Sequence, residues 1–284
     1  MFQVNNVSYR YPRNRDDTIR NLNFEMRQGE IFGLLGPSGV GKSTTQKIMV
    51  RLLTDYRGTI NYRNRDLKTF DKDYYQEIGV GFEVPVHFSK LTAEENINFF
   101  SKLYKNHIDT DSLMKRLGIY DERKKKVSEF SKGMKIRLNF VRAVMNNPVM
   151  LFLDEPTIGL DPANARILKN LIKEYRDNGG TVLLSTHLMN DVDELCDRVA
   201  FMVDGSIKEI DTPQSLKLKH GENKVVLEFM DSSVIAKATF EMDTLSSNSD
   251  FFNIIKTKKI ISMHSKETTL DDIFIKVTGV GKNA

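Results

Sequence analysis

A glycine-rich segment between a short apolar run and a helical pattern limits the possible folds of this chain more than any other feature. Residues 36–44 read GPSGVGKST, directly after the apolar run Ile31–Leu35 and at the start of a helix expected from about Lys42 to Leu53. This order of strand, turn and helix fits the phosphate-binding pattern GxxxxGK[ST]. The loop residues are Gly36, Pro37, Ser38, Gly39, Val40, Gly41, Lys42, Ser43 and Thr44. The competing interpretation, an incidental glycine-rich turn, leaves the flanking strand and helix unexplained.

Each residue type in this loop is suited to binding phosphate. Glycines let backbone N–H groups turn inward around a β-phosphate, and the start of a helix adds free N–H groups and the positive end of its dipole. Lys42 is expected to reach the β- and γ-phosphates, and the Ser43 hydroxyl to ligate Mg²⁺. The segment therefore predicts binding of ATP with Mg²⁺.

Two carboxylates follow a second apolar run. Val149–Leu153 reads as a buried strand, and Asp154 and Glu155 come directly after it. In open α/β sheets, ligands bind outside the carboxyl ends of the strands, so these side chains are expected at the same edge as the phosphate loop. Asp154 is placed to hold Mg²⁺, and Glu155 to orient or deprotonate the attacking water. The alternative is that the two acids simply mark a strand end exposed to solvent. The phosphate loop upstream favours the functional interpretation.

The rest of the pattern predicts an α/β fold. Short apolar strands alternate with helical segments, as in a parallel sheet flanked by helices. Thr181–Ser185 reads as one such strand, and a helix is expected between Asp161–Pro162 and Gly179–Gly180. Thr92 and Glu95 form a capping-box pattern at the start of a mostly helical insert, about residues 84–146.

A smaller region is expected after the main domain. We predict one domain over residues 1–214 and a small α+β appendage over residues 215–284. Short strands are expected at Val225–Phe229, Ala238–Met242 and Ile260–His264, followed by a helix with Leu270, Ile273, Phe274 and Val277 on one face.

With these motifs in place, residues 2–213 resemble the nucleotide-binding subunits of ABC transporters. Phe130–Met134 (FSKGM) resembles the family's signature, Pro156–Asp161 resembles the loop after the second carboxylate, and Ser185–His187 carries a histidine at the switch position. The resemblance implies a P-loop NTPase of ABC type, with a parallel-sheet core, an antiparallel β subdomain, the helical insert and the appendage.

The resemblance also implies an ATPase that works as a head-to-tail dimer. Ser131 and Gly133, at the start of a helix, are implied to contact the γ-phosphate bound by a second copy of the chain, together with Met134. His187 is implied to contact the same phosphate, and Asp161 to lie at the dimer seam, although Asp161 also reads as a helix N-cap. Tyr11 resembles the aromatic residue on which adenine stacks, with Tyr9 as a competitor.

The motifs depart from the family's pattern at two places. The signature carries Lys132 and Met134 where glycine or serine and then glutamine are usual. Glu83 stands where glutamine is usual, and its carboxylate is expected to keep contact with Mg²⁺ while adding negative charge near the phosphates.

These departures, with Leu270–Phe274 (LDDIF), resemble the branch that drives drug, lipid, polysaccharide or peptide exporters. The implied partner is an integral membrane permease that docks on Val84–Lys105, where Phe88, Phe99, Phe100 and Tyr104 offer apolar surface. Packing within the insert is an equal alternative for these aromatic residues. The expected location is the cytoplasmic face of the cell membrane, peripheral and held by the permease.

Charge and hydropathy limit the other functions that the chain could have. The net charge is +4, with 42 basic and 38 acidic residues interspersed, so no nucleic-acid partner is expected. No apolar stretch approaches the roughly 18 residues needed to cross a bilayer. The alternative function is a soluble ABC-type ATPase that acts on ribosomes or nucleic acid without a membrane partner.

Overall fold

The computed structural model describes residues 1–222, 224–266 and 268–279 of the 284-residue chain. The chain divides into two compact units, Met1–Thr212 and Pro213–Ala284. Among the described residues, no helix has the length and apolar character that crossing a membrane requires.

The larger unit contains ten strands and seven α-helices among its residues, all of which are described. The strands are β1 (Phe2–Tyr9), β2 (Ile19–Met26), β3 (Ile31–Leu35), β4 (Arg57–Tyr62), β5 (Arg65–Asp66), β6 (Ile78–Gly81), β7 (Met150–Asp154), β8 (Thr181–Thr186), β9 (Arg198–Val203) and β10 (Ser206–Asp211). The helices are α1 (Lys42–Met49), α2 (Tyr74–Glu77), α3 (Ala93–Ser101), α4 (Thr110–Arg116), α5 (Lys132–Val144), α6 (Pro162–Asp177) and α7 (Met189–Leu195), with 3₁₀ turns at Leu67–Thr69 and Val127–Glu129.

The core of this unit is a six-stranded sheet in the order β10-β9-β3-β8-β7-β6. All neighbours are parallel except β10, which runs antiparallel to β9. Every residue of β3, β7 and β8 is buried, as expected for central strands covered on both faces. Because β3, β8 and β7 are parallel neighbours, the segments that follow them emerge at one edge of the sheet.

A four-stranded antiparallel sheet, β2-β1-β4-β5, packs against the parallel sheet. Its buried face is aromatic and aliphatic: Phe24 stacks on Phe32 of β3 with ring centroids 5.4 Å apart, and Phe2 meets Phe152 of β7 at 6.1 Å. The parallel core, the antiparallel subdomain and the helical insert confirm the predicted fold class.

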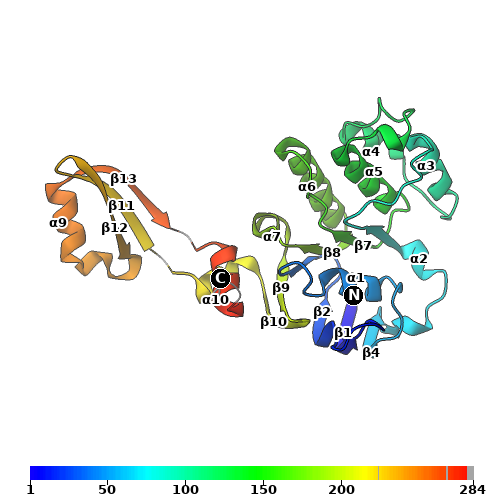
Figure 1. The fold of residues 1–284 in the computed structure, drawn as a ribbon, viewed down its shortest axis with the longest axis horizontal. Coiled ribbons are helices and arrows are strands. Elements are labelled where there is room, and N and C mark those ends of the chain that lie inside the picture. The colour runs from blue at the N-terminus through cyan, green and yellow to red at the C-terminus, as the bar shows by residue number, and fades with distance from the viewer. Residues whose placement is uncertain (223, 267, 280–284) are drawn as a thin grey trace. The chain divides into compact units, whose positions relative to one another are not determined.

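The helical insert consists of separate short helices. Figure 1 shows α3, α4 and α5 gathered at one end of the larger unit, away from β1, β2 and β4. The Thr92–Glu95 capping box at the start of α3 is present, with both reciprocal hydrogen bonds. Non-helical residues separate α3, α4 and α5, whereas the sequence pattern suggested more continuous helical character up to about Asn146.

The smaller unit combines a three-stranded antiparallel sheet with helices. Its elements are α8 (Pro213–His220), β11 (Lys224–Asp231), β12 (Val234–Glu241), a 3₁₀ turn (Met242–Ser247), α9 (Ser249–Thr257), β13 (Lys259–Lys266) and α10 (Leu270–Thr278), with the sheet in the order β12-β11-β13. Leu227 and Phe229 pack against Phe251 of α9, a helix that the sequence analysis did not expect. In α10 the expected apolar face, Leu270, Ile273 and Phe274, is buried.

Candidate functional site

The phosphate loop joins the end of β3 to the start of α1 through a backbone turn that uses two glycines with positive φ. Gly39 and Gly41 have φ of +81° and +112°, in the region that favours glycine. Gly41 is the N-cap of α1 and offers no side-chain cap, so the first N–H groups of the helix face the loop without an internal acceptor. A Cβ at Gly36 would lie 2.4 Å from the carbonyl oxygen of Met202, so a side chain there would displace β9. The loop therefore presents backbone donors at the edge of the sheet.

Lys42, the first residue of α1, is buried, with 6% of its surface exposed. Its Nζ donates to the carbonyl oxygens of Gly36 and Pro37 at 2.6 and 3.1 Å. Burial lowers the pKa of Lys42, and the negative charges of Glu155, Asp154 and Glu83 act in the opposite direction. The ammonium group is thus held over the loop by two carbonyl oxygens.

A pocket of about 150 Å³ lies at this edge. Its lining comes from the loop and from three other segments: Ser38, Gly39, Gly41, Lys42, Ser43, Thr44, Glu83, Glu155 and His187. Predicted residues more than a hundred positions apart in the sequence therefore meet in one place.

Asp154 ends strand β7 and is held by its neighbour on β8. Only 4% of Asp154 is exposed, and its Oδ1 accepts a short hydrogen bond from the Ser185 hydroxyl. The parallel register pairs these two residues directly across the strands. The carboxylate is thus fixed through one of its oxygens.

Glu155 lies just beyond the strand end with φ of +49°, a left-handed conformation that is unfavourable for a residue with a side chain. Its Oε2 accepts from the Thr186 hydroxyl at 2.8 Å, and its Oε1 lies 2.8 Å from Nδ1 of His187. The unusual backbone turns the carboxylate toward the pocket, where both oxygens have a partner in this chain.

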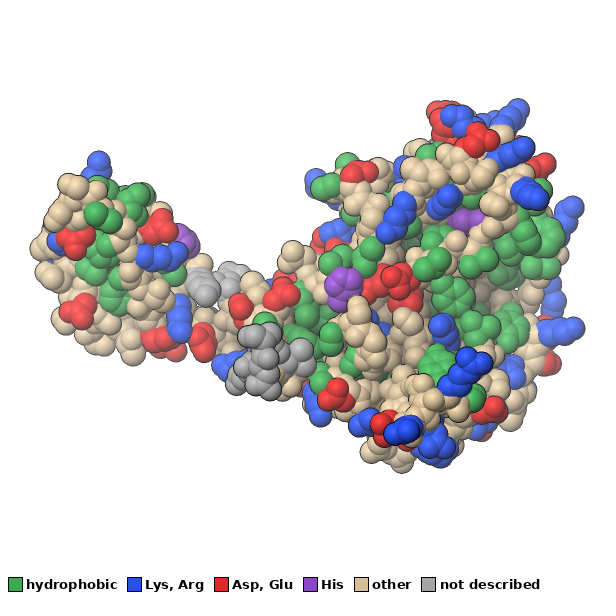
Figure 2. Space-filling model, viewed as in Figure 1, with side chains coloured by type: hydrophobic (Ala, Val, Ile, Leu, Met, Phe, Trp, Pro, Cys, Tyr) green, Lys and Arg blue, Asp and Glu red, His purple; other side chains and the backbone are tan. Residues whose placement is uncertain are grey.

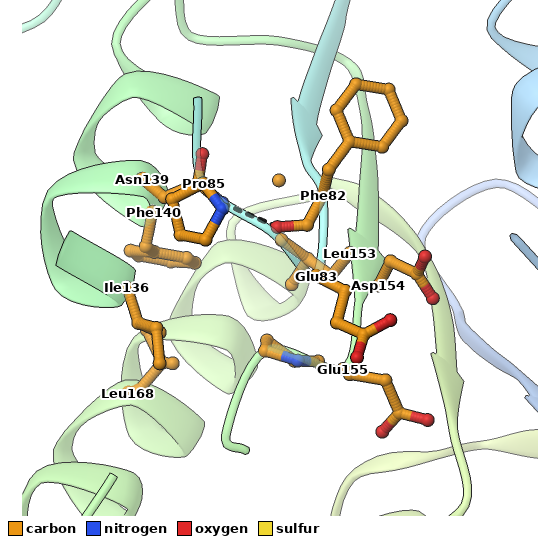
Figure 3. A pocket seen from close by; sticks show the side chains of 12 residues that line it. Phe82, Glu83, Pro85, Ile136, Asn139, Phe140, Leu153, Asp154, Glu155 and Leu168 are labelled. Carbon is orange, nitrogen blue, oxygen red and sulfur yellow. Dashed lines mark hydrogen bonds between the residues drawn. The ribbon is translucent and has the colours of Figure 1, made fainter. Parts of the chain in front are cut away.

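Glu83 follows β6 and brings a third carboxylate to the same edge. In Figure 3 the carboxylates of Glu83, Asp154 and Glu155 lie on one side of the view, away from Ile136, Phe140 and Leu168. Among the described residues, no three Asp, Glu, His or Cys side chains are close enough to form a ready-made metal cage. The available donors, carboxylates and the Ser43 hydroxyl, are the hard oxygen ligands that Mg²⁺ prefers.

The predicted signature residues lie outside this pocket. Ser131 is the N-cap of α5, and its hydroxyl accepts from the backbone N–H of Met134 at 3.2 Å. The Cα of Gly133 faces Gly159 and Leu160, so this helix start packs beside the loop that follows Glu155. Asp161 caps α6 by accepting from the N–H groups of Ala163 and Asn164 at 3.1 and 3.0 Å. Within one chain, Ser131, Gly133, Met134 and Asp161 are therefore not brought to the lysine.

The two tyrosines considered for adenine stacking have different surroundings. Tyr9 is buried in the core with 6% exposure, and burial raises its pKa. Tyr11 is half-buried, meets Tyr9 edge-on, and its hydroxyl lies 3.3 Å from that of Thr44 at the end of the phosphate loop. Of the two, only Tyr11 combines accessible ring surface with contact to the loop.

Sequence reasoning missed three residues that support the site. Gln46 and Ser185 contact each other and Ser185 contacts Asp154, while Thr186 contacts Glu155. The signals available were the helical spacing of Gln46 from Lys42 and the polar end of the Thr181–Thr186 strand. Neither signal distinguishes a supporting residue from an ordinary polar one.

The segment expected to dock a permease presents apolar surface in part. Val84, Val86, Phe88, Phe99 and Leu103 are between 46% and 71% exposed. Figure 2 shows hydrophobic side chains on the surface of the larger unit. Phe88, Phe99 and Phe100 also contact one another, with ring centroids 4.9 to 5.7 Å apart. Internal packing and surface exposure therefore coexist in these aromatic residues.

Hydrogen bonds from α5 fix the segment that leads from Glu83 to this surface. Asn139 donates to the carbonyl oxygen of Phe82 at 3.0 Å, the bond drawn in Figure 3. Arg142 donates to the carbonyl of Val86 through a short bond, and Nε2 of His87 lies 3.0 Å from the carbonyl oxygen of Lys135. Helix α5 thus holds the backbone beside Glu83.

Comparison with known families and proteins gives a consistent result. The pattern of the ABC transporter family matches residues 19–158, and that of the fluoroquinolone efflux ABC transporter C-terminal domain matches residues 223–267. A fluoroquinolones export ATP-binding protein of Mycobacterium tuberculosis is 43% identical over 281 residues, which cover 98% of this chain and 93% of that protein. A bacitracin transport ATP-binding protein of Bacillus licheniformis is 29% identical, with 93% of each chain covered.

Solved structures resemble the larger unit. An ATP-binding subunit of an ABC transporter has a TM-score of 0.70 and 26% identity, over 77% of this chain and 92% of that one. A dimeric ATP-binding cassette in a post-hydrolysis state, bound to ADP and Pi, has a TM-score of 0.65 and 25% identity, over 75% of this chain and 98% of that one.

Proposed function

This chain belongs to the ABC transporter family, as an ATP-binding subunit of an exporter, and we propose that its cargo is a fluoroquinolone-like drug. It binds and hydrolyses ATP to drive export through a separate membrane-spanning subunit. The observation that supports the cargo is the extent of the likeness: 43% identity to a fluoroquinolones export ATP-binding protein runs through both units, and the smaller unit matches the efflux family's own C-terminal pattern.

The proposed catalytic step uses Glu155 and His187. Glu155 acts as the base that orients and deprotonates the attacking water, because its carboxylate is turned to the pocket beside Lys42. Lys42 and the N–H groups of the loop hold the β- and γ-phosphates. His187, in contact with Glu155 before nucleotide binds, exchanges that contact for the γ-phosphate, so its position differs before and after hydrolysis.

Mg²⁺ is the proposed metal, held by Asp154 and Ser43, with Glu83 as a third oxygen donor. The oxygen-only donor set fits this ion, and bound Mg²⁺ would neutralise charge on the phosphates. Asp154 keeps one oxygen free of the Ser185 contact for that purpose. Adenine stacking is assigned to Tyr11, whose hydroxyl lies at the end of the loop.

A second copy of the chain completes the nucleotide site. Ser131, Gly133 and Met134 lie away from the pocket of their own chain, and the start of α5 carries N–H groups suited to an anion. We assign these residues, with Asp161 at the seam, to the γ-phosphate side of the partner copy's ATP. ATP then joins the two copies, and its hydrolysis lets them separate.

The permease is proposed to dock on the apolar surface of Val84–Lys105, which places the chain at the cytoplasmic face of the membrane. The exposed side chains of Val84, Val86 and Phe88 lie on the segment that follows Glu83. Contact with the permease would therefore reach the nucleotide pocket through a few residues. A soluble ATPase acting on ribosomes or nucleic acid leaves this surface and the efflux-type C-terminal pattern without a use.

The cargo is tested in cells that carry the native copy of this chain. Replacing it with Lys42→Ala is expected to raise the intracellular level of a fluorescent fluoroquinolone to that of energy-depleted cells. Lys47→Ala, on the same helix but outside the pocket, is the matched control and should export normally. If the Lys42→Ala cells accumulate no more drug than the control, fluoroquinolones are not the cargo.

A further inference from the structure

Behind the phosphate loop, a buried glutamine joins helix α1 to the carboxyl ends of β7 and β8. Gln46 has no exposed surface. It stands four residues after Lys42, so the two side chains share one face of the helix. Its Nε2 donates to the carbonyl oxygen of Leu153 and to the hydroxyl oxygen of Ser185, both at 2.9 Å. Lys42 thus contacts the phosphate loop, while Gln46 contacts β7 and β8, the strands that lead to the carboxylates.

The donors and acceptors of this cluster allow one consistent arrangement. The carbonyl oxygen of Leu153 only accepts, so the amide nitrogen of Gln46 has to face it. An amide nitrogen only donates, so Ser185 accepts from Gln46 and keeps its own hydroxyl hydrogen for Oδ1 of Asp154. The direction of the hydrogen bonds therefore runs from Gln46 through Ser185 to Asp154.

The other end of the Gln46 amide is unfavourable. Its Oε1 is buried and has no hydrogen-bond partner in the described part of the chain. A buried acceptor without a partner destabilises a fold, and an apolar side chain of similar size would not introduce one. The residue is therefore poorly explained by packing alone, whereas its nitrogen makes two well-formed contacts beside Asp154.

We propose that Gln46 is a positioning residue for the metal-binding carboxylate. Acting through Ser185, it keeps Oδ1 of Asp154 satisfied and the carboxylate in one orientation, which leaves Oδ2 for the Mg²⁺ that accompanies ATP. Without Gln46 the Ser185 hydroxyl is free to rotate away from Asp154. This inference rests on the proposed role of Asp154 as a metal ligand.

The test distinguishes a specific loss of Mg²⁺-dependent nucleotide binding from a general loss of nucleotide binding. The dissociation constant of a non-hydrolysable ATP analogue is measured by calorimetry with saturating Mg²⁺ and again in EDTA, on the full chain. Loss of a residue that orients a metal ligand typically weakens metal binding about 10- to 100-fold. The ratio of the constant in EDTA to the constant in Mg²⁺ is therefore expected to fall by about 10-fold or more in Gln46→Met, because binding weakens in Mg²⁺ and is unchanged in EDTA. Equal losses in both conditions, or no change in either, would overturn the proposal.

Three further variants make the test decisive. Ser185→Ala breaks the same relay with a small change in volume, so it should give the same selective loss even if Gln46→Met folds poorly. The double variant should be no worse than Ser185→Ala alone, because both act through one path; additive losses would contradict the relay. Thr45→Val, which removes another buried side-chain hydrogen bond of α1, should leave the ratio unchanged.

Asp154→Asn distinguishes failure of this inference from failure of the proposed metal site. If Asp154→Asn removes the Mg²⁺ dependence while Gln46→Met retains it, the metal site stands and the positioning role is wrong. If Asp154→Asn leaves the Mg²⁺ dependence intact, the metal role of Asp154 is itself wrong, and the positioning role is overturned with it.

Discussion

At the scale of single residues, Glu155 combines an unfavourable backbone with two specific contacts. Its positive φ directs the carboxylate into the pocket, and the bonds from Thr186 and His187 hold it there. Conformations of this kind persist where the surrounding structure enforces them, often at reactive sites. The geometry therefore agrees with a base that is ready before the nucleotide arrives.

Glu155→Gln is expected to bind ATP normally and to hydrolyse it at least about 100-fold more slowly, because an amide keeps the size of the side chain but cannot accept the proton of water. Steady-state phosphate release and nucleotide affinity, measured on the same preparation, check this. Hydrolysis within a few-fold of the unmodified chain would rule out Glu155 as the base.

At this scale the sequence predicts the residues proposed for catalysis and metal binding, but not the residues that contact them. Lys42, Asp154 and Glu155 were predictable because the phosphate loop and the strand that ends in acids are local patterns. The link between Gln46 and Asp154 was not predictable, because the two residues are 108 positions apart and a glutamine in a helix is a common residue. Such a contact depends on the register of β7 beside β8, which no local pattern specifies.

At the scale of elements, the segment between β6 and α3 connects the pocket to apolar surface. The side chains of Asn139 and Arg142 in α5 bond to its backbone, and the His87 side chain bonds to the backbone carbonyl of Lys135. Burial, chiefly, lowers the pKa of His87 to about 4, with a further contribution from the charges of Arg142 and Lys135. His87 is therefore neutral in the fold at physiological pH.

A pH dependence of stability follows. The folded pKa of His87 lies below the ordinary value of 6.5, so between about pH 4 and 6.5 the unfolded chain binds more protons. The free energy of unfolding should fall as pH drops through this window, by on the order of 2 kcal/mol. His87→Gln, which can still donate to Lys135, should remove this part of the slope in denaturant titrations between pH 4 and 7.

The apolar surface itself gives another prediction. Phe88→Asp places a charge on a side chain that is 46% exposed, and it should release the chain from membranes that contain its permease. Phe252→Asp, at 42% exposure in the smaller unit, is the control and should remain bound. Membrane flotation of both variants provides the measurement, and equal binding of the two would exclude Val84–Lys105 as the docking surface.

Helices and strands with a strong local sequence pattern were predicted best. The predicted bounds of the strand Thr181–Ser185 and of the helix after Asp161 agree with the structure within a residue or two. An apolar run marks the strand, and a proline at the start and glycines after the end mark the helix. Helix α9 was missed: it follows strand-like sequence, and its buried contact, Phe251, appears only once the three-stranded sheet forms. The Thr92 capping box was correct because its reciprocal bonds involve residues three apart.

At the scale of the whole molecule, we propose that each chain carries two incomplete halves of a nucleotide site. The pocket at Lys42 has no lining residue from the start of α5, where Gly133 lies beside Gly159 and Leu160. With Mg·ATP, Glu155→Gln should therefore sediment as a dimer, and Lys42→Ala as a monomer under the same conditions. A Glu155→Gln chain that stays monomeric at saturating ATP would contradict the shared site.

This ATPase drives export through a separate membrane-spanning subunit. A pull-down from detergent-solubilised membranes, with the Glu155→Gln variant and Mg·ATP and mass spectrometry of the retained proteins, tests this. We expect a polytopic membrane protein that is retained in stoichiometric amount and is lost when Phe88→Asp is added. Ribosomal or DNA-associated proteins without any membrane protein would contradict the exporter assignment.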